Sequence, residues 1–176
     1  MKLLDIEIVD FSDFQDNIKK IFFHKDNNRD YYLNVIWYLE ELLELLLEIY
    51  NISDLFNYEN YQNINDNFND NLAVELSDNL AWIFSVLNLN DIKIDKVFVI
   101  KSSLDNFTRC LYNLIYFNLY FIKALRKKDL KNIRNSAYLI IFFIIKICKL
   151  LGYKDLDFVF SRYSLCPKCL KEKCVC

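Results

Sequence analysis

A near absence of glycine and proline is the feature that most constrains the fold of this chain. Its 176 residues include one glycine, Gly152, and one proline, Pro167. P-loops and dinucleotide-binding turns need several glycines where the backbone approaches phosphate, and all-β folds need frequent turn residues. Of these turn residues only asparagine is plentiful here. We therefore expect an all-α fold, in which any phosphate chemistry depends on metal ions and charged side chains.

The rest of the composition excludes several further classes. A net charge of −2 gives no sign of a nucleic-acid-binding surface, and the single histidine, His24, excludes an HExxH motif or a multi-histidine metal site. The N-terminal stretch carries acids where a signal peptide is apolar. The longest apolar run, residues 137–145, is too short to cross a bilayer. We expect a cytoplasmic protein with no membrane partner.

Apolar residues recur at three- and four-residue spacing along the chain, and this spacing predicts helices. The predicted helices span residues 10–23, 31–50, 72–89, 94–101, 107–126 and 130–151. Residues 51–71 are rich in asparagine and predict a long connection. Gly152 is well placed to end the last predicted helix.

A short internal repeat suggests that the chain has two related halves. Residues 90–98 and 152–160 share an aspartate, a valine and a phenylalanine at the same offset, and each segment follows a long apolar helix. Helical periodicity alone can produce part of this match. We interpret the chain as a fused pseudo-dimer: an acidic unit at 1–106, a degenerate structural unit at 107–163 and a cysteine tail at 164–176.

Acidic residues gather on one face of each of two apolar helices. At about 100° per residue, one arc of the helix predicted at 31–50 holds Asn34, Trp37, Glu41, Glu44 and Glu48. A similar arc of the helix predicted at 72–89 holds Asn71, Glu75, Asp78, Asn79 and Trp82.

If these two helices pack antiparallel, four carboxylates converge: Glu41, Glu44, Glu75 and Asp78. Their mutual repulsion would be relieved by Mg²⁺ or Mn²⁺, which prefer oxygen ligands. The same register brings both tryptophans to one end of the acids, where they could stack a nucleobase. The alternatives are solvated helix faces for the acids and core packing for the tryptophans.

These residues carry a resemblance to a known family. The order Glu40-Glu41-x-x-Glu44 followed by Glu75-x-x-Asp78 resembles the EExxE…ExxD signature of the MazG-like and dimeric dUTPase-like all-α nucleoside triphosphate pyrophosphohydrolases. The flanking tryptophans and the CPxC…CxC tail are similar to archaeal-type MazG-like proteins. The gap between the two halves of the signature is longer than usual, and the second half of the chain has no matching acids.

The resemblance implies a helical bundle that cleaves nucleoside triphosphates between the α- and β-phosphates, giving a monophosphate and pyrophosphate. The four carboxylates would hold Mg²⁺ (or Mn²⁺), Glu40 would orient or deprotonate water, and Trp37 and Trp82 would contact the nucleotide. Lys101 would contact phosphate, or is an ordinary solvated lysine. Relatives dimerise, so a homodimer is a further expectation. The alternative function is a non-catalytic helical scaffold with a zinc-binding tail for protein or nucleic-acid contacts.

Four of the six cysteines lie in the last eleven residues, as Cys166-x-x-Cys169 and Cys174-x-Cys176. Four thiolates at such spacing suit one compact structural Zn²⁺ site. A disulfide or redox role, and a tail that binds nothing, are the alternatives.

Overall fold

The computed structural model describes residues 6–56, 70–100 and 106–176, and these residues form a predominantly helical fold with a small β-ribbon. The side chains of 52–56 and 70 lie outside this description. In chain order the elements are β1 (Ile6–Asp10), α1 (Ser12–Asp26), α2 (Tyr31–Phe56), α3 (Asp70–Leu89), β2 (Lys96–Ile100), α4 (Phe107–Lys127), α5 (Leu130–Leu150) and α6 (Asp157–Arg162). The prediction of a helical fold is confirmed.

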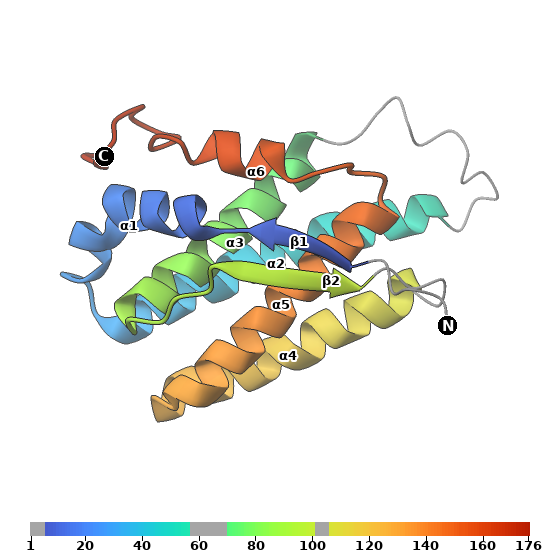
Figure 1. Cartoon of the computed structure of the whole chain (residues 1–176), viewed down its shortest axis with the longest axis horizontal. Helices are drawn as coiled ribbons and strands as arrows, with labels where there is room; N and C mark the ends of the chain where they lie inside the picture. Colours follow the sequence, from blue (N-terminus) through green and yellow to red (C-terminus); the bar gives the residue numbers. More distant parts are fainter. Residues whose placement is uncertain (1–5, 57–69, 101–105) are drawn as a thin grey trace.

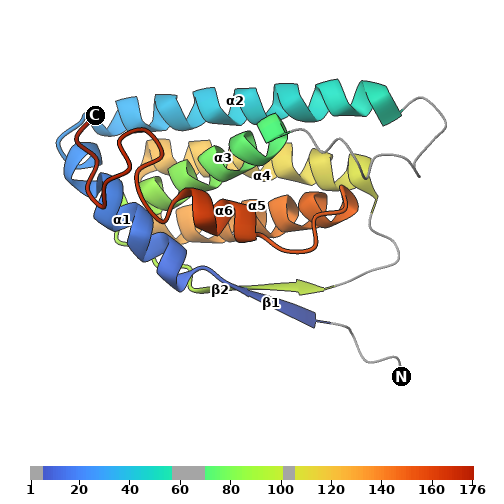
Figure 2. The same cartoon turned by 90° about the horizontal axis from the view of Figure 1, so that it is seen from above.

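The long helices form two antiparallel pairs, α2 with α3 and α4 with α5 (Figures 1 and 2). Figure 2 shows α2 along one side of the molecule and the β-ribbon along the opposite side. Helices α1 and α6 both pack against α3, and the C-terminus lies beside α1. This arrangement places the acid-bearing faces of α2 and α3 next to the C-terminal segment.

Short polar side chains begin helices α2, α4 and α5. The Asp30 carboxylate accepts hydrogen bonds from the backbone N–H groups of Tyr32 and Leu33, at 2.8 and 3.2 Å. Asn106 caps α4 by accepting from Arg109 N–H at 3.1 Å, and Asp129 caps α5 in the same way. Each side chain satisfies a donor that has no partner within its helix.

Helices α3, α4 and α5 all end with a residue in the left-handed conformation, and only one of these residues is glycine. Gly152 has φ 91°, and the next N–H, of Tyr153, donates to Cys148 O, as expected for a helix end of this type. Asp91 and Lys128 take the same position after α3 and α4, with φ 51° and 53°. Aspartate and lysine at these positions explain how the fold forms with so little glycine.

One continuous hydrophobic core joins the two helix pairs. Phe11 stacks on Phe84 of α3 with ring centroids 5.3 Å apart. Tyr38 of α2 lies edge-on to Phe121 of α4, also at 5.3 Å, and its hydroxyl donates to the Asn118 carboxamide oxygen in a short hydrogen bond. The core therefore extends across the boundary that the sequence analysis placed between residues 106 and 107, and that division stays a prediction.

The prediction of a helix at 94–101 is wrong, because residues 96–100 form strand β2. This strand pairs antiparallel with β1, with Ile8 opposite Phe98 and Asp10 opposite Lys96. Val97 and Val99 are buried and their neighbours exposed, which is the two-residue alternation of a strand. A short β-branched run gives an ambiguous signal on its own, and its partner strand lies almost 90 residues earlier in the chain.

The two segments of the internal repeat adopt different structures. Residues 96–100 form strand β2, whereas Asp157–Arg162 form the short helix α6. The matching residues therefore lie in elements of different type, and the duplication stays a prediction.

Candidate active site

Three of the four predicted carboxylates meet between α2 and α3. Oxygens of Glu41 and Glu44, from α2, and of Glu75, from α3, all lie within 4.8 Å of one another. In an octahedral Mg²⁺ site, ligand oxygens are about 3 Å apart when adjacent and about 4.2 Å apart when opposite, so modest side-chain movement would be needed for all three to contact one ion. We call these three residues the acid group.

Burial and repulsion from neighbouring carboxylates favour the protonated forms of Glu41 and Glu75. The pKa of Glu41 is raised to about 7, first by burial and then by the neighbouring carboxylates of Asp78 and Glu44. The pKa of Glu75 is raised by burial and by Glu44 and Asp78. A divalent cation would remove the repulsion that causes part of both shifts.

Two polar side chains of α3 have buried atoms without a hydrogen-bond partner. They are Glu75, through Oε2, and Asn79, through both atoms of its carboxamide. Asn79 is 0% exposed and lies one turn from Glu75, about 40° around α3. Buried polar groups are normally hydrogen-bonded, and an unpaired one costs about 1–3 kcal/mol. These atoms are therefore available to bind a ligand. When a ligand fills the site, they could also bond to each other.

Asp78, the fourth predicted ligand, is held by the C-terminal segment. Arg162 donates from Nε to Asp78 Oδ1 at 2.7 Å and from Nη2 to Oδ2 at 3.0 Å. The Tyr163 hydroxyl also donates to Oδ1, at 2.7 Å. Sequence reasoning missed Arg162 and Tyr163, because they lie 84 and 85 residues from Asp78 and no local spacing links them to it.

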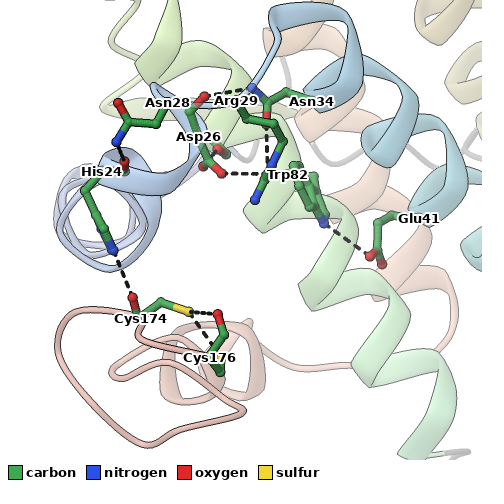
Figure 3. Close-up of polar contacts among 10 residues, drawn as sticks. His24, Asp26, Asn28, Arg29, Asn34, Glu41, Trp82, Cys174 and Cys176 are labelled. Carbon is green, nitrogen blue, oxygen red and sulfur yellow. Dashed lines mark hydrogen bonds and ion pairs between the residues drawn. The ribbon is translucent and has the colours of Figure 1, made fainter.

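The two tryptophans meet beside the acid group, as their register predicts. The rings of Trp37 and Trp82 are perpendicular, with centroids 5.5 Å apart, and Trp82 Nε1 donates to Glu41 Oε1 at 3.2 Å (Figure 3). The Arg29 guanidinium lies 3.8 Å from the centroid of Trp37. The pair is therefore not a flat double platform, and Arg29 already contacts Trp37. The contact of the tryptophan pair with a nucleobase stays a prediction.

Arg29 is fixed by a buried polar network at the α1–α2 turn (Figure 3). Its Nη1 donates to Asp26 Oδ1 at 3.0 Å and to Asn34 Oδ1 at 2.9 Å. Asp26 is buried and also accepts a short hydrogen bond from Ser85 of α3. Burial raises the pKa of Asp26 despite these donors. The network connects α1, α2 and α3 at the aromatic end of the site.

The remaining predicted site residues lie elsewhere. Glu40 is exposed on α2, beside Glu41 in sequence but outside the acid group. Lys101 lies outside the described residues. Their roles stay predictions.

The four C-terminal cysteines form a second cluster. The sulfur atoms of Cys166, Cys169, Cys174 and Cys176 all lie within 4.8 Å of one another, and Cys166 and Cys176 are 3.8 Å apart. In a tetrahedral site with Zn–S bonds of about 2.3 Å, sulfur atoms are about 3.8 Å apart. A hydrogen bond from the Val175 backbone lowers the pKa of Cys169 to about 6. These four cysteines can hold a metal such as zinc, and we call residues 166–176 the knuckle.

The knuckle is docked on α1. Cys174 N–H donates to Ile21 O at 3.0 Å, and His24 Nε2–H donates to the Cys174 carbonyl at 2.8 Å (Figure 3). Cys166 and Cys174 pack with Ile21 in a small apolar cluster. His24 is the single histidine of the sequence and so cannot belong to a multi-histidine metal site. Its hydrogen bond positions the backbone of the knuckle instead.

No protein-family model, curated protein or solved structure matches this chain. Within the part of the chain that the structure describes, the segment Asn71–Leu89 in α3 is long and apolar enough to cross a membrane. Because 67% of that segment is buried in the fold, and a core helix meets the same criteria, this is weak support for a membrane span.

Proposed function

We propose that this chain is a Mg²⁺-dependent nucleoside triphosphate pyrophosphohydrolase of the MazG-like, dimeric dUTPase-like type. It would release a nucleoside monophosphate and pyrophosphate. The observation that carries the proposal is the approach of three carboxylates, from Glu41, Glu44 and Glu75, to within 4.8 Å between two antiparallel helices. The signature order of these acids in the sequence supports the same assignment.

The residues at the site fit a hard divalent cation. All three members of the acid group offer oxygen, which Mg²⁺ and Mn²⁺ prefer. The unpartnered Glu75 Oε2 and the buried Asn79 carboxamide provide further unused polar atoms there. The acid group would hold the ion, and the ion when bound would screen the phosphates and activate water.

Other residues of the chain would position the substrate. The aromatic surface of Trp37 and Trp82 adjoins the acid group through the hydrogen bond to Glu41, so a base bound there would place its phosphates toward the carboxylates. Arg29 adds a positive charge beside Trp37. Glu40, exposed one residue from Glu41, is the candidate to orient the attacking water. The α4–α5 pair would complete the bundle as a structural half without acids.

A specific observation favours a second candidate, a scaffold whose knuckle binds another macromolecule. Leu170 and Val175 expose large apolar side chains on the knuckle, at 73% and 63%. Contiguous exposed apolar patches mark contact surfaces, and these two side chains lie within the same short segment of the chain. This candidate needs no convergence of carboxylates, so catalysis distinguishes the two.

The test is pyrophosphate release by the purified full chain from a mixture of nucleoside triphosphates with Mg²⁺. We expect equal amounts of pyrophosphate and monophosphate. Glu41→Gln and Glu75→Gln should each reduce release by at least about a hundredfold, because each removes a charge that would hold the ion. Glu40→Gln should reduce the maximal rate with little change in Mn²⁺ affinity.

The matched control is Asp16→Asn, which makes the same kind of change on the exposed face of α1. It should leave release unchanged. If the wild-type protein releases no pyrophosphate from any nucleotide, or if the acid-group variants retain full release, the enzyme proposal is wrong. In that case the scaffold becomes the better account.

A further inference from the structure

Asp78 differs from the acid group because both of its oxygens are already bound. Arg162 engages them in a two-point ion pair, and Tyr163 donates a third hydrogen bond. Such paired contacts between guanidinium and carboxylate are strong and fix geometry. The charge of Asp78 is therefore compensated within the protein.

The groups that hold Asp78 are firmly placed. Tyr163 is buried and packs edge-on against Phe14 and Phe22 of α1, with centroids 6.1 and 6.0 Å apart. Arg162 is the last residue of α6, which packs on α3. The contacts with Asp78 therefore belong to a packed interface and are not an isolated surface ion pair.

The same segment continues directly into the knuckle. Two residues separate Tyr163 from Cys166, and the knuckle is hydrogen-bonded to α1 through Cys174. Figure 1 shows α6 and the C-terminal segment passing over α3 toward α1. We call residues 157–176 the strap. It is fastened to α3 at Asp78 and to α1 at Cys174.

We infer that Arg162 and Tyr163 are positioning residues, which withdraw Asp78 from the metal site so that the docked strap leaves a three-carboxylate site of Glu41, Glu44 and Glu75. This inference rests on the proposed function, because it concerns the same cation. It differs from the expectation that Asp78 holds the ion together with the three glutamates.

The docked strap changes the charge beside the acid group. With the strap docked, the Arg162 guanidinium is paired with Asp78 beside the acid group, whereas loss of the Arg162 charge would leave Asp78 unpaired next to the acid group. Opposite charges at short range attract strongly where water is partly excluded. The site without Arg162 should therefore bind a divalent cation more tightly, and it should do so only when Asp78 is present.

The experiment is a Mn²⁺ titration of the full-length chain, with free Mn²⁺ measured by electron paramagnetic resonance. We expect Arg162→Met to tighten Mn²⁺ binding about tenfold. Arg162→Lys keeps the charge but loses the two-point geometry, so its Mn²⁺ affinity should lie between those of the wild type and Arg162→Met. The double variant Asp78→Asn with Arg162→Met should return to the wild-type affinity.

Two results would overturn the inference: Arg162→Met binding Mn²⁺ as the wild type does or more weakly, or tightening that persists in the double variant. Tyr163→Phe, which removes one donor and keeps the ring, gives a second test less exposed to misfolding. It should tighten binding about twofold to threefold. Far-UV circular dichroism of each variant checks that the substitution has not unfolded the chain.

The outcome is separable from that of the proposed function. Pyrophosphate release is measured on the same samples, and its absence contradicts the proposed enzymatic activity. The Mn²⁺ titration still decides the role of Arg162 in that case. If Glu75→Gln binds Mn²⁺ as tightly as the wild type, the acid group is not the metal site and the inference fails, whatever the activity.

Discussion

Trp82 of α3 donates its indole N–H to Glu41 Oε1 of α2 at 3.2 Å. An indole nitrogen can only donate, so this bond favours the ionised carboxylate and works against the burial that raises the pKa of Glu41. The same indole lies perpendicular to the ring of Trp37, with centroids 5.5 Å apart. The aromatic pair and the acid group therefore form one connected unit.

We expect Trp82→Phe to weaken Mn²⁺ binding about fivefold near pH 6.5. The substitution keeps an aromatic ring but removes the donor to Glu41, and a hydrogen bond of this kind contributes about 1 kcal/mol. The loss should diminish above pH 8, where Glu41 is ionised in both proteins. Trp37→Phe is the matched control, since no hydrogen bond between Trp37 and an acid is seen in the described residues. An equal effect of the two substitutions would contradict the role of the indole N–H.

The raised pKa of Glu41 predicts that stability without divalent ions falls as the pH rises. The folded protein holds a proton on Glu41 up to about pH 7, whereas the unfolded chain releases it near the ordinary value of 4.5. The folded state thus binds more protons between these values, and the free energy of unfolding decreases across that window. Because Glu41 is partly exposed, we expect a loss on the order of 1 kcal/mol, or about 2–4 °C in Tm.

Thermal unfolding from pH 4.5 to 8 in the presence of a chelator measures this effect. Other groups also contribute to the pH dependence of stability, so the informative quantity is the difference between the wild type and Glu41→Gln. That variant should have the flatter profile. Added Mg²⁺ should stabilise the wild type more at pH 8 than at pH 5. Identical profiles for the two proteins would show that Glu41 is not the titrating group.

Asp26 should be important for stability and not only for the site. It is buried and paired with Arg29, and it accepts from Ser85. Asp26→Asn leaves the guanidinium without its charged partner, which costs about 2–3 kcal/mol for a pair that is mostly buried. We expect a Tm lower by roughly 5–10 °C. Chemical denaturation measures the change, with the exposed Asp16→Asn as control, and a loss below about 0.5 kcal/mol would contradict the prediction.

Features of the site that depend on helical spacing could be predicted from the sequence. Glu41 and Glu44 lie on one face of α2 because of their spacing, and the antiparallel packing of α3 brings Glu75 to them. The meeting of Trp37 and Trp82 follows from the same register. Periodicity fixes which residues share a face, and a hairpin of two helices leaves few ways to pair those faces.

Contacts between segments distant in the chain could not be predicted in this way. Arg162 reaches Asp78 from a six-residue helix that periodicity does not reveal. Strand β2 needs β1 as its partner, and the isolated run of Val97 to Val99 gives no sign of that pairing. In both cases the stabilising partner is chosen by tertiary packing, which a local pattern does not contain.

The final prediction concerns the knuckle and its link to Asp78. We expect the full chain to bind one Zn²⁺, measured by mass spectrometry of metal content, and Cys169→Ser with Cys176→Ser to bind none. Loss of this metal should loosen the strap at α1, because Cys174 provides its hydrogen bonds there. The Arg162 contact should then weaken, and Mn²⁺ affinity at the acid group should rise toward that of Arg162→Met.

The exposed Lys168→Ser, in the same loop, should keep both the Zn²⁺ and the wild-type Mn²⁺ affinity. If the cysteine variant lacks Zn²⁺ but binds Mn²⁺ as the wild type does, the knuckle and the acid group are independent.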